Sequence, residues 1–299
     1  MKTDCTLLAT LPTLNRMEQV RKVFESPAVS GVRYNSGVQT PYDPDTAVMM
    51  LSQMARQYGK TLWVDIKGRQ LRVLKWADPL YSCIELNHSI SFTPPAHVIF
   101  RNGDKVRITH TVDGNCIYVD PLPREALGAG QSVTVLANDL HISGYLTERD
   151  REHLAACRRY GVKNFMASFV ESLQDLDTIR AYVPDARIVS KIESLKGMDL
   201  VKNSPLTGLM AARDDLYLQC GRNCAMLGHL QAIVNKDPNA ICASRIFLSL
   251  EKNETPDLAD FADLELMYRF GYRSFMLCDN VSNYAFDGAV AAWNDFINA

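Results

Sequence analysis

The chain has no excess of basic residues, no long apolar run and no leader-like start. It carries 32 Lys and Arg against 34 Asp and Glu, a formal net charge of -2, without the basic footprint of a nucleic-acid-binding protein. Its apolar runs are too short to span a bilayer. Thr3 and Asp4 interrupt the start, so no signal-peptide core is recognised. We expect a cytoplasmic protein that binds neither nucleic acid nor a membrane.

Cysteine is present, but in no spacing that indicates a disulfide framework. The eight cysteines are scattered, and several lie inside apolar runs, as Cys242 does between Ile241 and Ala243. Free thiols in a reducing compartment explain this pattern better than disulfides. With 299 residues, 47% of them hydrophobic and 22% charged, the chain is large enough for one core, or for one core and a small satellite domain.

Short apolar runs alternate with amphipathic stretches along most of the chain. The candidate strands are residues 6–11, 31–35, 62–66, 164–168, 187–191, 208–212, 240–243 and 274–278. The candidate helices are residues 45–58, 148–160, 173–182, 218–234, 258–270 and 285–297. Eight strands with intervening helices predict the α/β class and a (β/α)8 TIM barrel. An open, doubly wound sheet is the alternative.

Between about residues 74 and 143 the pattern changes to short alternating runs, separated by turn signals at 102–104, 113–115 and 128–130. This predicts a small all-β domain inserted after the third barrel strand. We expect residues 1–72 and 144–299 to form the barrel, and residues 73–143 to form a β-barrel-like domain. A domain on a loop at the catalytic face of a barrel can act as a lid.

Two apolar runs about twenty residues apart end abruptly in charge. The first leads to Lys191 and Glu193, which share a face because they are two apart on one strand. The second leads to Arg213, Asp214 and Asp215. At the mouth of a barrel, two carboxylates can hold Mg²⁺ or Mn²⁺ while a lysine meets a phosphoryl group in transfer. A surface cluster of salt bridges is the alternative.

An ordered series of motifs extends from near residue 4 to the end of the chain. The most specific are Ser-Lys-Ile-Glu at 190–193 and Ala-Arg-Asp-Asp-Leu at 212–216, and weaker ones lie at 65–72, 146–150 and 167–170. In content and order they resemble the pyruvate kinase family. The resemblance implies a phosphotransferase that acts on phosphoenolpyruvate or pyruvate with ADP or ATP.

The resemblance also implies roles for side chains at the strand ends. Lys191 would meet the phosphoryl group, and Glu193 and Asp215 would hold the divalent ion. Ser244 would supply a hydroxyl group, where the family has threonine, to bind the substrate carboxylate or to guide a proton to the enolate. The turn that carries Asp215 would bind the substrate carboxylate, and its residues are Arg213, Asp214 and Asp215.

Residues of the second and third strand ends receive roles in the same way. Arg33 and Arg72 would face phosphate groups. A monovalent cation such as K⁺ would lie nearby, and its expected ligands are Asn35, Ser36 and Asp65.

Several positions depart from the family pattern. Asp214 stands where the family has glycine, so its carboxylate either adds negative charge beside the substrate or points away. The segment 33–37 is contracted, and the segments 241–247 and 276–281 differ from the family. The sequence ends where the family's barrel ends, so we expect no C-terminal effector domain, and a monomer or homodimer.

Two other functions stay open. A metal-dependent lyase or aldolase that forms a pyruvate enolate would need only Glu193, Asp215 and Arg213. A non-catalytic paralogue that binds a metabolite or a partner protein is favoured by the altered loops, because barrel chemistry lies in those loops.

Overall fold

A computed structural model of the chain describes residues 2–100, 102–137, 139–220 and 223–299. They form two compact units. The first unit combines the residues up to Ile66 with Arg149–Ala299, and the second is Lys67–Glu148. The divisions expected from the sequence, 72/73 and 143/144, lie a few residues inside the second unit.

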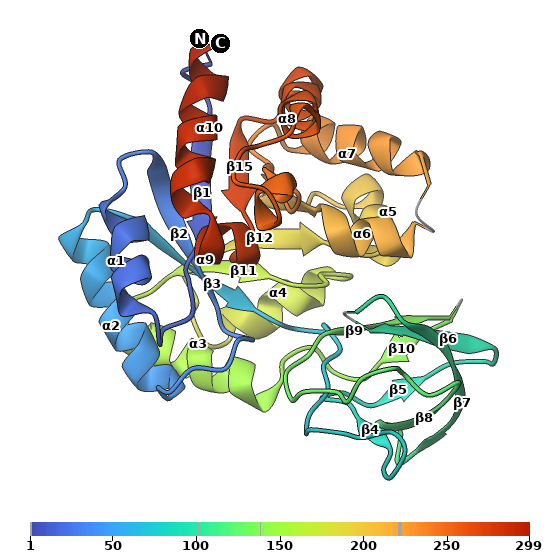
Figure 1. The fold of residues 1–299 in the computed structure, drawn as a ribbon. Helices are drawn as coiled ribbons and strands as arrows, with labels where there is room; N and C mark the ends of the chain where they lie inside the picture. Colours follow the sequence, from blue (N-terminus) through green and yellow to red (C-terminus); the bar gives the residue numbers. More distant parts are fainter. Residues whose placement is uncertain (1, 101, 138, 221–222) are drawn as a thin grey trace. The chain divides into compact units, whose positions relative to one another are not determined.

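The first unit is built around a closed barrel of eight parallel strands (Figure 1). Around the barrel the order is β1, β15, β14, β13, β12, β11, β3 and β2. Their bounds are β1 (Thr6–Thr10), β2 (Val29–Asn35), β3 (Thr61–Ile66), β11 (Asn164–Ala167), β12 (Arg187–Ile192), β13 (Leu209–Ala212), β14 (Ile241–Ala243) and β15 (Ser274–Leu277). All eight predicted strands are present, and the prediction of a (β/α)8 barrel is confirmed.

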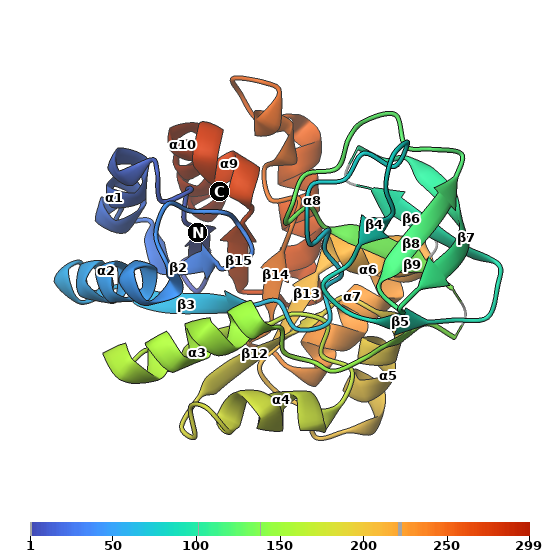
Figure 2. The same ribbon diagram turned by 90° about the horizontal axis from the view of Figure 1, so that it is seen from below.

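Helices lie on the outside of these strands (Figure 2). They are α1 (Met17–Glu25), α2 (Pro44–Gln57), α3 (Glu148–Tyr160), α4 (Leu173–Arg180), α5 (Leu195–Asn203), α6 (Arg213–Gln219), α7 (Ala225–Lys236), α8 (Leu258–Phe270), α9 (Asp279–Tyr284) and α10 (Phe286–Asn298), with a 3-10 turn η1 at Leu248–Glu251. Each buries one stripe, as α1 does with Val20, Val23 and Phe24. Within the described ranges, no helix is both long and apolar enough to cross a membrane.

The single helix predicted over 218–234 is wrong, because the structure has α6 and α7 in that region. The side chain of Asn223 lies between the two helices. Its Nδ2 donates to the carbonyl of Cys220 at 2.7 Å, and its Oδ1 accepts from the amide of Ala225 at 2.9 Å. An asparagine that binds backbone groups in this way competes with the helical ladder. The apolar spacing continues across the break and therefore conceals it.

The interior of the barrel changes from apolar to polar along the strands. A floor of buried residues is formed by Leu8, Met166, Val189, Met210, Ile241, Ala243 and Met276, with Trp63 packed against it. Alternate residues of a strand face the same way, so the positions two further along face the same interior. On four of these strands, those positions are Thr10, Asp65, Ser168 and Lys191. The sequence thus sets a polar layer on an apolar floor, at the carboxyl ends where barrel enzymes carry their chemistry.

The second unit contains the antiparallel strands that lie between β3 and β11 in the chain. They are β4 (Ile84–Glu85), β5 (Ile90–Ser91), β6 (Ala96–Phe100), β7 (Lys105–Val112), β8 (Cys116–Asp120), β9 (Val133–Leu136) and β10 (His141–Ile142). Five of them form a sheet in the order β4, β8, β7, β6 and β9, and β10 pairs with β5. Buried aliphatic side chains such as Val98, Ile108 and Ile117 form a core of its own. The predicted all-β insertion after the third barrel strand is confirmed.

Candidate active site

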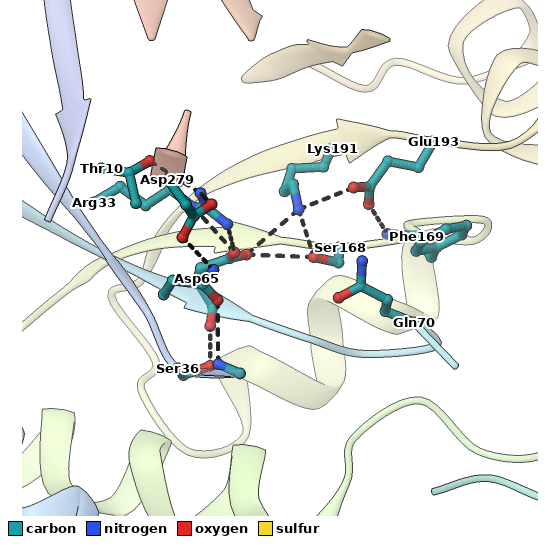
Figure 3. A network of polar contacts seen from close by, with 12 residues as sticks. Thr10, Arg33, Ser36, Asp65, Gln70, Ser168, Phe169, Lys191, Glu193 and Asp279 are labelled. Carbon is teal, nitrogen blue, oxygen red and sulfur yellow. Dashed lines mark hydrogen bonds and ion pairs between the residues drawn. The ribbon is translucent and has the colours of Figure 1, made fainter. Parts of the chain in front are cut away.

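Lys191 lies at the centre of the polar layer and is only 6% exposed (Figure 3). Its Nζ donates to Ser168 Oγ at 2.8 Å and lies 2.9 Å from Glu193 Oε1 and 3.6 Å from Asp65 Oδ1. Burial by itself lowers the pKa of Lys191, but the charges of Asp65 and Glu193 outweigh burial and raise it. Lys191 therefore stays a fixed cation in a place with little water.

Arg33 is the second cation of the layer and comes from β2. Its Nε donates to Asp65 Oδ2 at 3.0 Å, and its Nη2 binds the same oxygen. Its Nη1 donates to Thr10 Oγ1 at 3.0 Å and lies 3.2 Å from Asp279 Oδ2. Burial by itself lowers the pKa of Arg33, but the two carboxylates outweigh it and raise the pKa.

Asp65 connects the two cations. It is fully buried, with Arg33 on Oδ2 and both Lys191 and Ser168 on Oδ1. The Ser168 hydroxyl accepts from Lys191 and donates to Asp65 at 3.3 Å. These contacts, drawn as dashed lines in Figure 3, fix the position of Lys191 from two neighbouring strands.

Glu193 lies past the end of β12 and is 1% exposed. One oxygen faces Lys191, and the other accepts a hydrogen bond of 2.7 Å from the amide of Phe169. The backbone of Phe169 has a φ of 49°, in the left-handed region that non-glycine residues seldom adopt. Such strain persists where surrounding contacts hold it in place.

Asp215 lies close to Glu193 and is partly buried in the first turn of α6. Burial, and then the negative charge of Glu193, raise the pKa of Asp215 to about 7. Two neighbouring carboxylates repel each other when both are ionised. A divalent cation bound between them can offset this repulsion in place of a proton. Among the described residues, no group of three or more His, Cys, Asp or Glu could hold a metal ion. Mg²⁺ is usually bound by one or two carboxylates with water and substrate oxygens, and a pair such as Glu193 and Asp215 has the chemistry for this.

The predicted ligands of the monovalent cation are engaged with protein groups. Asn35 donates through Nδ2 to Asp279 Oδ1 at 2.7 Å, and its Oδ1 accepts from the amide of Gly37. The Ser36 hydroxyl donates to the carbonyl of Asp65. These bonds fix the turn after β2, and the binding of K⁺ there stays a prediction.

Arg213 and Asp214 lie beside each other in sequence but face different partners. The Arg213 guanidinium is 4% exposed and donates to the carbonyls of Ala243 and Ser244 and to Asp263 Oδ1, the last at 2.7 Å. Asp214 points outward, with its Oδ1 2.7 Å from Nε of Arg245. Arg245 is a partner of Asp214 that the sequence did not suggest. The predicted roles of Arg213 and Asp214 in substrate binding stay predictions.

Ser244 begins a strained turn after β14. The φ angles of Ser244, Arg245 and Phe247 are 67°, 62° and 54°. Its carbonyl is tied to Arg213, and its side chain is partly buried. Because side chains other than glycine avoid this region, the surrounding contacts must hold the turn. The catalytic role of its hydroxyl stays a prediction.

Arg72 belongs to the second unit. Its guanidinium donates hydrogen bonds to Gln70 Oε1 at 2.7 and 3.1 Å and to the carbonyl of Gly130 at 2.6 Å. Its amide donates to Asn87 Oδ1 at 2.8 Å. These partners all belong to the second unit, and the predicted contact of Arg72 with phosphate stays a prediction.

Four residues of the cluster received no role from the sequence. Ser168 and Phe169 lie in the motif at 167–170, and Thr10 ends the first strand. Asp279 follows the apolar run of the eighth strand. An apolar run that ends in charge is the signal that drew attention to Lys191 and Glu193, and the same signal would have found Asp279.

Known proteins with similar sequences belong to one family. Residues 103–286 match the family model described as pyruvate kinase, barrel domain. A pyruvate kinase of Thermoplasma acidophilum is 25% identical over 293 residues, covering 88% of this chain and 52% of the relative. Pyruvate kinase 1 of Saccharomyces cerevisiae is 26% identical over 243 residues, covering 67% of this chain and 47% of the relative.

The chain spans about half the length of these curated relatives. The family model covers more than half of this chain, and the barrel supplies the motif residues at neighbouring strand ends. The chain therefore belongs to the pyruvate kinase family.

Proposed function

We propose that this chain is a divalent-metal-dependent phosphotransferase that moves a phosphoryl group between phosphoenolpyruvate and a nucleoside diphosphate. The observation that carries the proposal is the setting of Lys191. It is a buried cation beside the carboxylate pair Glu193 and Asp215, at the carboxyl end of a barrel. Phosphoryl transfer needs positive charge in fixed positions, more than it needs a nucleophile from the protein.

Each side chain of the cluster has a separate role in this reaction. Lys191 Nζ meets the phosphoryl oxygens, and Ser168 and Asp65 hold it in position. Arg33 binds a phosphate oxygen from the neighbouring strand. Mg²⁺ or Mn²⁺ held by Glu193 and Asp215 would neutralise charge on the phosphoryl and enolate oxygens.

Further roles follow from family membership. The Ser244 hydroxyl binds the substrate carboxylate or guides a proton to the enolate. K⁺ beside Asn35, Ser36 and Asp65 adds a positive charge near the phosphate.

The test measures ADP-dependent formation of pyruvate from phosphoenolpyruvate with Mg²⁺ or Mn²⁺, with and without K⁺. We expect turnover in the wild type and a loss of at least about 100-fold in Lys191→Met. Lys202→Met, an exposed lysine on α5, is the matched control and should retain activity. Wild-type turnover no greater than that of Lys191→Met would refute the proposal.

The enolate lyase or aldolase of the sequence analysis gains no support from the geometry, because Arg213 is occupied by backbone carbonyls and Asp263. Exchange of the pyruvate methyl protons with solvent, measured by NMR without nucleotide, distinguishes it. Exchange without any phosphoryl transfer would favour enolate chemistry over the proposed reaction.

A further inference from the structure

The cation Arg33 is shared between two carboxylates of different character. Asp65 is fully buried on β3 and binds both Nε and Nη2. Asp279 is the first residue of the six-residue helix α9, its side chain is 37% exposed, and it meets Nη1 alone at 3.2 Å. Because Asp279 is partly exposed and holds Arg33 through one nitrogen, it is the partner of Arg33 that can be exchanged at lower cost.

Two donors converge on the Asp279 carboxylate. Arg33 Nη1 faces Oδ2, and Asn35 Nδ2 faces Oδ1 at 2.7 Å. One guanidinium nitrogen and one amide nitrogen, each aimed at a different oxygen of one anion, also suit two oxygens of a phosphate or of a second carboxylate. The Asp279 carboxylate thus occupies a position built for an anion.

We propose that Asp279 is an internal anion on the phosphate subsite of Arg33 and Asn35, and that a phosphoester substrate must displace it to bind. This inference rests on the proposed function and deepens it by naming a residue that sets substrate affinity. Asp279 keeps the two donors aligned and neutralises Arg33 before the substrate arrives. The affinity for the phosphoester is lower as a result, because the phosphate cannot bind the two donors while Asp279 occupies them and is repelled by the Asp279 carboxylate.

The test compares binding of phosphoenolpyruvate, and separately of inorganic phosphate, to the wild type and Asp279→Asn by calorimetry. Asparagine keeps the shape and one oxygen but removes the charge. We expect a Kd about ten-fold lower for both ligands. In turnover, KM for the phosphoester should fall by a similar factor, with little change in kcat, because the charge opposes binding and takes no part in transfer.

Asp287→Asn is the matched control. Asp287 is an exposed residue of α10 that pairs with Lys22, so its substitution removes the same charge elsewhere on the barrel unit. We expect wild-type affinity. Asp279→Ser, which replaces the carboxylate by a shorter, neutral hydroxyl, should bind both ligands more tightly than the wild type, and it provides a second measurement if the asparagine variant folds poorly.

The outcomes separate the two claims. If the wild type binds phosphoenolpyruvate and turns it over, but Asp279→Asn binds it no more tightly, the displacement model is wrong and the proposed function stands. If neither form binds either ligand at millimolar concentration, the proposed function and the displacement model both fail. An equal gain in affinity for Asp287→Asn would indicate a general charge effect and would also overturn the displacement model.

Discussion

Two buried serines on neighbouring strand ends differ in what their hydroxyl groups contact. Ser168 joins Lys191 to Asp65, whereas Ser190 Oγ has no hydrogen-bond partner in the part of the chain that the structure describes. Ser168→Ala should lower the free energy of unfolding by about 1–3 kcal/mol, because it leaves charged partners less well satisfied. Ser190→Ala should be neutral or stabilising. Urea unfolding of both variants makes the comparison, and equal losses would mean that the Ser168 contacts contribute nothing specific.

Asp215 gives the metal-free protein a pH dependence. The pKa of Asp215 is raised from its ordinary value of 3.8 to about 7 in the folded protein, so the folded state binds the proton more tightly. The associated stability is present below about pH 4 and is lost as the pH rises to about 7. At pH 8 without divalent ions, Asp215→Asn should therefore be more stable than the wild type, by about 1–3 kcal/mol. Chemical denaturation at pH 4 and pH 8 measures the difference, which should vanish at pH 4.

Divalent ions should reverse this ranking. Mn²⁺ at pH 8 can bind between the two ionised carboxylates of Glu193 and Asp215 and offset their repulsion, so the wild type should gain thermal stability and Asp215→Asn should gain much less. Chelation with EDTA should return the wild type to its metal-free melting temperature. Equal stabilisation of both proteins by Mn²⁺ would show that the ion binds elsewhere.

The sequence allowed part of the cluster to be predicted, for a local reason. Lys191 and Glu193 are two apart on one strand, and strand alternation alone predicts a shared face. Asp279 meets Arg33 and Asn35 across 246 and 244 residues of sequence, a contact that exists only once the barrel closes β15 against β1. The direction of Asp214 depended in the same way on Arg245, which lies on the loop after a different strand.

At the scale of elements, two glycines differ in whether the structure leaves room for a larger residue. Gly208, just before β13, has a φ of +69°, and a Cβ there would lie 2.6 Å from the carbonyl oxygen of Ile188. Gly208→Ala should therefore cost about 2–4 kcal/mol, through backbone strain and overpacking. Gly228 lies within α7, where a Cβ would meet no atom within 4 Å, so Gly228→Ala should stabilise by about 0.5–1 kcal/mol. Thermal denaturation tests both, and similar effects at the two sites would contradict the argument.

The first turn of α6 and the loop after β14 are joined by an ion pair between two residues that depart from the family pattern. The side chains of Asp214 and Arg245 are 51% and 45% exposed. A double-mutant cycle with Asp214→Asn and Arg245→Gln should give a coupling energy of only about 0.2–1 kcal/mol, because water and salt screen the pair. The coupling should shrink further in 1 M salt. A larger, salt-insensitive value would mean that the pair is shielded from solvent.

The strands were predictable because a barrel buries each of them on both faces, which leaves near-continuous apolar runs in the sequence. The helices were less predictable from the sequence. α1, α5 and α9 were not predicted, and α6 and α7 were merged because the apolar spacing carries through Asn223. Breaks made by one side chain that binds two helix ends leave little trace in an apolar pattern.

At the scale of the whole molecule, each of the two units has its own core. The core of Lys67–Glu148 is assembled from residues of that unit alone, among them Ile84, Val98 and Ile117. Residues 67–148 should therefore fold when expressed by themselves, with a dispersed amide NMR spectrum and cooperative melting. Ile117→Asp, which places a charge in this core, should abolish both. A collapsed spectrum for the unsubstituted segment would mean that the barrel is needed to order it.

Asp65 has an evolutionary consequence as the carboxylate that both cations share. A single substitution there would remove one counter-charge from both cations at once, leaving Glu193 beside Lys191 and Asp279 beside Arg33, so its effect depends on what stands at the other two positions. We expect that lineages can lose Asp65 only after, or together with, one of the cations. Asp279 pairs with Arg33 rather than with Lys191, so this double constraint does not apply to it. Divergence of this cluster should therefore begin at the eighth strand and reach the third strand last.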